Sequence, residues 1–81
     1  MIETIEQLIK AEIDCQHLKV EGDGSHFSVV LVSEAFAGLR SVKRQQMVYA
    51  TVNEHIASGA IHALTIKAYT DEEWQKVKHF Q

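Results

Sequence analysis

The sequence has no proline, only four glycines and a single cysteine among its 81 residues. One cysteine excludes an internal disulfide, and it excludes a metal site built from four thiolates of one chain. No apolar run approaches the ~18 residues of a membrane-spanning helix, so we expect no membrane segment. The amino-terminal residues are acidic and mixed, which is not typical of a signal or transit peptide. We therefore expect a cytoplasmic protein.

The composition is that of a small globular domain. Hydrophobic residues make up 46% of the chain and charged residues 23%, unlike a disordered tail. This length has room for one domain, which we place at residues 1–81. A domain so small buries only about 60 to 65% of the surface that its unfolded chain exposes. A deep catalytic cleft is hard to build in it, and we expect a protein that is not an enzyme.

The charge balance is acidic, with a net charge of −3 and a pI of about 5.9. Proteins that bind nucleic acid through bulk charge usually have a pI above ~9, so nucleic-acid binding here must rest on a local patch. The more unusual number is five histidines. Imidazole is a common metal ligand and titrates near neutral pH, so the histidines are the first candidates for a functional site.

Changes in hydrophobic period divide the first half of the chain into elements. Apolar residues at helical spacing predict a helix over residues 2–13. From Leu18 the period becomes two, and the Asp-Gly step within residues 22–25 predicts a hairpin turn. The apolar, β-branched segment 27–32 predicts a central strand.

The second half predicts a short helical turn capped by Ser33, a long helix from Ser41 to just before Gly59, and a third strand over residues 61–69. A final helix is predicted by a capping box, formed by Thr70 and Glu73, and by an apolar stripe of Trp74, Val77 and Phe80. The order is α-β-β-(α)-α-β-α. Amphipathic helices in this order cover one face of a three-stranded mixed sheet. The predicted fold class is α+β, a two-layer sandwich of the KH-like, class II type.

The long helix is predicted to have an inward and an exposed face. The inward residues are predicted to be Val42, Tyr49, Val52 and Ile56, with Val48 on the flank. The exposed face is predicted to carry Arg40, Lys43, Arg44 and Met47. Three cations at a helix start oppose the helix dipole. They are either a solvated face or a contact for phosphates or an acidic partner, and an exposed Met47 favours a protein contact.

No catalytic or zinc-binding set emerges from the sequence. Cys15 and His17 lack an Asn or Asp placed to orient the imidazole, so a half-buried structural cysteine is the better interpretation. His26, His55 and His62 lack the spacing of a closed zinc site. Strand alternation places His62 on the face of Leu64, where its structural interpretation is a partly buried, hydrogen-bonded side chain. If the second and third strands are neighbours, His26 and His62 share one end of the sheet; alternation alone leaves this open.

Five ordered blocks of the sequence resemble the BolA family, and they span nearly the whole chain. The blocks are residues 20–27 (VEGDGSHF), 32–38 (VSEAFAG), 42–49 (VKRQQMVY), 61–64 (IHAL) and 69–74 (YTDEEW). The glycine-rich turn and the Arg-Gln-Gln segment look most like the short bacterial IbaG branch. The resemblance implies a KH-like fold without the Gly-x-x-Gly loop that clamps nucleic acid, and the corresponding segment 38–41 has only one glycine.

The resemblance also implies partnership with a monothiol glutaredoxin and a [2Fe-2S] cluster bridged between the two proteins. The glutaredoxin cysteine and a glutathione thiol ligate the cluster on one side. On the other side the family's ligand positions map onto His62 and onto His26, whereas Cys15 lies outside them. No cluster is expected in the isolated chain. The family is also described as DNA-binding, through its basic helix, and is linked to acid stress and cell-envelope morphology.

The chemistry of the residues agrees with these implied roles. Clusters are usually held by four thiolates, and a chain with one cysteine cannot supply them. One or two histidines added to a partner's thiolates complete the ligand count, raise the reduction potential and couple it to protonation. The first hypothesis is therefore a non-enzymatic iron–sulfur partner. The second is a transcription regulator that places Arg40, Lys43 and Arg44 on DNA, and the acidic pI favours the first.

Overall fold

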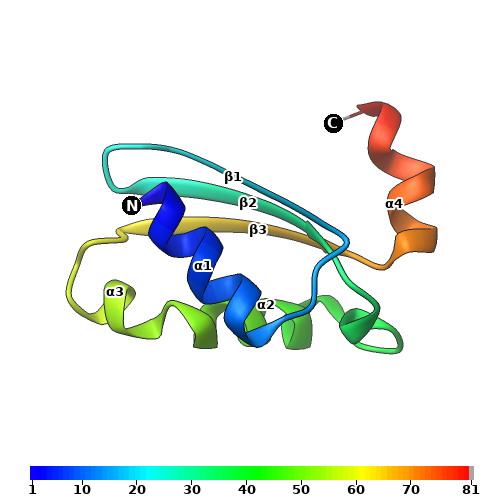
Figure 1. Ribbon diagram of the computed structural model, residues 1–81, viewed down its shortest axis with the longest axis horizontal. Helices are drawn as coiled ribbons and strands as arrows, with labels where there is room; N and C mark the ends of the chain where they lie inside the picture. Colours follow the sequence, from blue (N-terminus) through cyan, green and yellow to red (C-terminus); the bar gives the residue numbers. More distant parts are fainter. Residues whose placement is uncertain (81) are drawn as a thin grey trace.

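The computed structural model describes residues 1–80, and a three-stranded sheet runs through its centre (Figure 1). The elements in chain order are α1 (Ile2–Glu12), β1 (His17–Asp23), β2 (His26–Val32), the 3-10 turn η1 (Glu34–Phe36), α2 (Ser41–Thr51), α3 (Asn53–Ala57), β3 (Ala63–Tyr69), α4 (Asp71–Val77) and the 3-10 turn η2 (Lys78–Phe80). Among the described residues, no helix is both long and apolar enough to cross a membrane.

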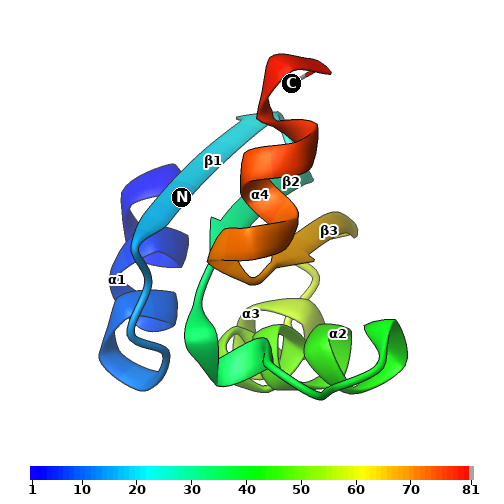
Figure 2. The ribbon, with the colours of Figure 1, turned by 90° about the vertical axis from the view of Figure 1, so that its right-hand side faces the viewer.

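The sheet has the order β1-β2-β3, with β1 antiparallel to β2 and β3 parallel to it. The hairpin between β1 and β2 closes through Gly24, whose φ of 66° suits a residue without a side chain. The parallel connection needs a crossover, which η1, α2 and α3 supply. Figures 1 and 2 show α1, α2 and α3 on one face and α4 beyond the other face, at one end. The predicted α+β fold with a mixed sheet is confirmed.

The core lies between the sheet and the three helices α1, α2 and α3. Its most completely buried side chains include Ile5, Ile9, Val29, Leu31, Phe36, Val48, Val52 and Ile61. Gly22 is part of this packing rather than part of the turn, because β1 continues to Asp23. A Cβ on Gly22 would lie 2.1 Å from Cδ1 of Phe27, its partner across the hairpin, so only glycine leaves room for that ring.

The predicted long helix is divided in two, and this corrects the expectation of one helix up to Gly59. α2 ends at Thr51, and Val52 has non-helical dihedral angles of −118° and 15° before α3 begins. The local sequence carries no glycine or proline at this break. Val52 is buried in the core, and tertiary packing overrides local helix propensity there.

The faces of α2 are also rotated from those predicted. Val48 is fully buried, whereas Val42 is 62% exposed and Tyr49 is 37% exposed. Arg44 is inward, on the same helical line as Val48 and Val52, and Met47 packs against the core as a half-buried side chain. The prediction placed Arg44 outward because it lies opposite the residues that were assigned to the inward face. In the fold its guanidinium is instead bound by Leu39, Ala68 and Glu73.

Arg44 holds α4 against the end of β3. Its guanidinium donates to both carboxylate oxygens of Glu73, at 2.5 and 3.1 Å, and to the carbonyls of Leu39 and Ala68 at 2.9 and 3.1 Å. Glu73 also accepts from the backbone N–H of Thr70 at 2.9 Å, which confirms the predicted capping box. The hydrogen bond from Arg44, followed by that from Thr70, lowers the pKa of Glu73 to about 2. We call this arrangement the Arg44–Glu73 latch.

The residues of α4 reach over the end of the sheet. The indole of Trp74 stacks on the imidazole of His17, with ring centroids 5.0 Å apart, and it contacts the Tyr69 ring at 5.7 Å. Val77 is half-buried, as the apolar stripe predicted. The side chain of Phe80, the last residue of that stripe, lies outside the part that the structure describes.

The rotation of α2 is tested by two valine truncations in that helix. Val48→Ala should lower the free energy of unfolding by about 2 kcal/mol, because it removes buried apolar atoms and leaves a cavity. Val42→Ala should change it by less than about 0.5 kcal/mol, since Val42 is exposed. Urea denaturation measures both values, and equal losses would contradict the observed helix face.

The latch predicts a specific pH dependence of stability. The folded protein lowers the pKa of Glu73 from 4.5 to about 2, so its carboxylate stabilises the fold above pH 4.5 and loses that effect as pH falls towards 2. Glu73→Gln should cost about 1 kcal/mol at pH 7, because the side chain is 44% exposed and solvent screens the pair. The difference between the two proteins should shrink between pH 4.5 and 2.

Glu72→Gln is the control for this experiment. Glu72 is neighbouring, exposed and only loosely paired with Lys76 at 3.7 Å, so its variant should follow the parent protein at every pH. Urea denaturation of the three proteins over this pH range gives the comparison. A Glu73→Gln variant whose stability runs parallel to the parent down to pH 2 would contradict the latch.

Candidate functional site

His26 and His62 come together at one end of the sheet. The parallel register pairs His26 with Ala63, and the backbone N–H of His62 donates to the carbonyl of Ser25 at 2.8 Å. Strand alternation alone left open whether His26 and His62 share one end of the sheet. They do, because β2 and β3 are neighbours. We call this region, Ser25 to His26 with His62 to Ala63, the histidine end.

The two imidazoles flank the sheet from different sides. Strand alternation puts His26 on the face of Ser28, away from α1, α2 and α3. His62 precedes β3 on the helix side, with its Nε2 atom 3.9 Å from the place that a Cβ on Gly59 would take. Both side chains are exposed, so the partly buried position expected for His62 is wrong. Their ring nitrogens are accessible to a ligand beyond the end of the sheet.

An apolar pocket of about 390 Å³ adjoins His62. Its lining residues are Tyr49, Ile56, Ile61, His62, Ala63 and Leu64. The hydroxyl of Tyr49 donates to the carbonyl of Leu64 at 3.1 Å, which holds the aromatic ring beside the pocket. A partner can therefore place an apolar group here while another of its atoms meets the imidazole. Tyr49 was predicted to be a core residue, so its position beside this pocket was not anticipated.

The number of donors decides which metal groups the histidine end can hold. Across residues 1–80, no three His, Cys, Asp or Glu side chains are grouped to hold a metal ion. A [2Fe-2S] cluster needs four ligands, and His26 and His62 would supply two of them. These residues fit one side of a cluster shared with a second molecule, which must bring the other two ligands.

Cys15 is not part of the histidine end. It lies between α1 and β1, and the next residue, Gln16, donates its N–H to the carbonyl of Val32 at the far end of β2. The Cys15 thiol donates to the carbonyl of Ile13 at 3.5 Å. Burial, and then the nearby charge of Asp14, raise the pKa of this thiol. A thiol with a raised pKa is a poor nucleophile and a poor metal ligand at neutral pH.

The predicted basic face of α2 is smaller than the sequence indicated. Arg40 and Lys43 are exposed. Arg44 belongs to the latch with its side chain only 12% exposed, and Met47 is half-buried against the core. A nucleic acid or an acidic partner that approaches the start of α2 therefore meets two exposed cations rather than three.

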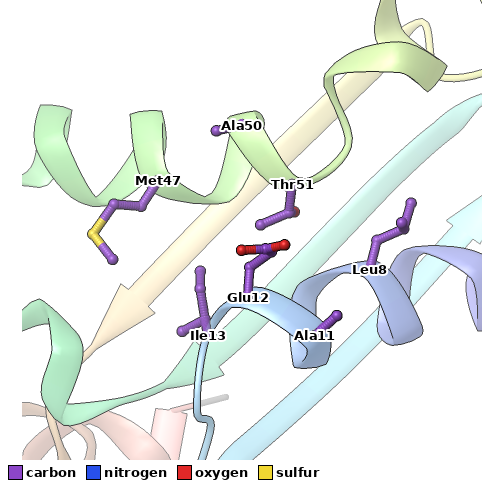
Figure 3. A pocket seen from close by; sticks show the side chains of 7 residues that line it. All are labelled: Leu8, Ala11, Glu12, Ile13, Met47, Ala50 and Thr51. Carbon is purple, nitrogen blue, oxygen red and sulfur yellow. The ribbon is translucent and has the colours of Figure 1, made fainter.

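A second depression, a groove between α1 and α2, is lined in part by Met47 (Figure 3). It has a volume of about 370 Å³, and its walls are Leu8, Ala11, Glu12, Ile13, Met47, Ala50 and Thr51. Figure 3 shows the carboxylate of Glu12 between the two helices, facing Thr51. Among the side chains that line the groove, the Glu12 carboxylate is the one candidate metal ligand.

Comparisons with known proteins show which family this chain is similar to. Residues 6–73 match the family model described as BolA-like protein. The chain is 46% identical over 72 residues to the acid stress protein IbaG of Escherichia coli K12, covering 89% of this chain and 86% of that relative. It is 40% identical over 85 residues to the DNA-binding transcriptional regulator BolA of Vibrio cholerae, covering 93% and 79%.

A solved structure gives the same fold. The crystal structure of a bol-like protein from Babesia bovis matches with a TM-score of 0.84 at 28% identity, covering 96% of this chain and 93% of the other. Three findings agree: the shared fold, the family model that matches most of the chain, and the sequence identity to known relatives. The chain belongs to the BolA-like family.

Proposed function

We propose that this protein is a non-enzymatic partner of a monothiol glutaredoxin and that the two share a bridging [2Fe-2S] cluster through His62 and His26. The observation that carries the proposal is the pairing of β2 with β3, which brings two exposed histidines to one end of the sheet, with an apolar pocket beside His62. A role in cluster transfer or stress sensing follows from it. The name of the E. coli relative, an acid stress protein, supports a stress-related role.

Each residue has a distinct part in this proposal. A shared [2Fe-2S] cluster supplies one-electron redox chemistry and a labile bond that allows its transfer. His62 offers an imidazole nitrogen beside the pocket, and His26 offers a second nitrogen from the outer side of the sheet. Tyr49 and Leu64 provide the apolar surface on which the partner packs. The glutaredoxin cysteine and a glutathione thiol complete the four ligands.

The ligand assignment is tested by removing each imidazole from the mixed complex. The purified chain is combined with a monothiol glutaredoxin, iron, sulfide and glutathione, and visible absorption and circular dichroism are recorded. His62→Ala should change or abolish the spectrum of the mixed complex, and His26→Ala should have a smaller effect. Both variants should stay folded because both side chains are exposed.

His79→Ala is the control, since His79 is exposed in η2, next to α4 at the other end of the sheet. Its spectrum should equal that of the parent complex. An unchanged spectrum for His62→Ala would reject His62 as a ligand.

Histidine ligation also predicts that acid weakens the shared cluster. Protons compete with iron for the imidazole nitrogen, and an unperturbed imidazole titrates near ~6.5. The cluster of the mixed complex should weaken below pH ~6, before the all-thiolate cluster of the glutaredoxin homodimer does. Replacing His62 by cysteine (His62→Cys) should shift the loss to lower pH. Identical acid profiles for the two chains would reject imidazole protonation as the trigger.

The alternative function is a DNA-binding regulator that uses the start of α2. The name of the Vibrio cholerae relative, a DNA-binding transcriptional regulator, favours it. The exposed cations there are Arg40 and Lys43. Two cations neutralise about two phosphates, so this surface by itself supports only weak binding with a shallow salt dependence. Iron–sulfur partnership is therefore the function that the arrangement of residues supports best.

A further inference from the structure

The face of the sheet that points away from α1, α2 and α3 is covered by α4 only at one end (Figures 1 and 2). Strand alternation assigns to this outer face Lys19 on β1, Val30 on β2 and Lys67 on β3. The register places these three residues in one row, with Val30 between the two lysines. Both lysines are exposed. Neighbouring strands lie about 4.8 Å apart, so the two cations stand roughly 10 Å apart across β2.

A depression of about 280 Å³ lies beside this row, where α4 meets the sheet. Its lining residues are His17, Lys19, Glu21, Val30, Trp74 and Lys78. The stacked rings of His17 and Trp74 form an aromatic wall of this depression. Lys78 in η2 also lines it and adds a third cation to Lys19 and Lys67. Small-molecule pockets are typically ~300–1,000 Å³, so a depression of this size suits a single planar ring rather than a whole cofactor.

The outer face is less acidic than the chain as a whole. Its strand residues together with Lys78 carry three cations (Lys19, Lys67 and Lys78) and two carboxylates (Glu21 and Asp23), a balance of 3 − 2 = +1, whereas the net charge of the protein is −3. The carboxylate in this depression is that of Glu21, which pairs with Lys19 at 3.2 Å. Both members of that pair are more than 60% exposed, so a phosphate can replace the carboxylate at little cost. The complement of this face is a polyanion that carries planar rings.

We propose that the outer face of the sheet binds single-stranded nucleic acid, with phosphates on Lys19, Lys67 and Lys78 and a base against His17 and Trp74. Proteins that hold single strands combine a basic surface with aromatic side chains on which unpaired bases stack. A duplex keeps its bases stacked inside and offers only its phosphates. This surface is separate from the start of α2. Along β2, the lysine row lies four residues from His26, about 13 Å, and the level of His17 lies six residues away, about 20 Å. The proposed contacts include neither His26 nor His62, so the proposal does not depend on the iron–sulfur function.

Trp74 makes the proposal directly measurable because it is the only tryptophan of the chain. The full chain is titrated with a twelve-nucleotide oligothymidylate at low salt, and the intrinsic fluorescence is recorded together with the anisotropy of a labelled copy of the oligonucleotide. We expect saturable quenching, and we expect affinity to fall with salt as if about two or three ions were released. Inorganic polyphosphate, which lacks bases, should quench much less.

Two double variants, each of which removes two cations, locate the surface. Lys19→Gln with Lys67→Gln should weaken binding at least tenfold, whereas Arg40→Gln with Lys43→Gln should change it less than about threefold. All four side chains are exposed, so both variants should fold like the parent, which far-ultraviolet circular dichroism checks.

Four results would overturn the proposal: no binding, equal quenching by polyphosphate, equal affinity for a duplex of the same length, or a loss confined to the Arg40 and Lys43 variant. The last result would assign nucleic-acid binding to α2 instead. None of these outcomes affects the cluster spectra of the mixed complex, so failure here is distinguishable from failure of the iron–sulfur function.

Discussion

The whole arrangement depends on β2, which pairs along all seven of its residues with β1 on one side and β3 on the other. This double register fixes which residues share a row of the sheet and which share an end. It sets His26 beside Ala63 and so brings His62 to the same end as the hairpin turn. It also sets Val30 between Lys19 and Lys67. Both candidate surfaces thus follow from one set of backbone hydrogen bonds.

The two ends of the sheet differ in how far their side chains are held by other parts of the protein. At the carboxyl end of β3, the Arg44–Glu73 latch, the capping box and the His17–Trp74 stack fix α4 in place. At the histidine end, exposed imidazoles and an open apolar pocket leave room for a partner. Rigidity at one end and accessibility at the other suit a small adaptor.

Local signals in the sequence predicted most of the fold. Period-two alternation, the Asp-Gly turn and the Thr70 capping box each depend on neighbouring residues, and all three are confirmed. The rotation of α2 could not be predicted in this way. Arg44 has its partner 29 residues away, so a charged residue that is inward in the fold was assigned to the surface. The break at Val52 is likewise a consequence of tertiary packing.

The candidate site shows the same division between local and long-range information. Alternation and the family resemblance singled out His26 and His62, but only strand pairing establishes that they share one end. No local signal indicated the aromatic pair on the outer face, because His17 and Trp74 come from opposite parts of the chain and meet only when α4 docks.

The central claim is that a partner's cluster sits at the histidine end, and its most direct test is nuclear magnetic resonance. The nitrogen-15-labelled chain is mixed with cluster-loaded monothiol glutaredoxin, and its backbone amide spectrum is compared with that of the complex without cluster. Because an iron–sulfur cluster broadens nearby resonances, the account predicts that amides around Ser25, His26 and His62 disappear while those of His17 and Trp74 persist. Broadening centred on Arg40 and Lys43, or none at all, would contradict it.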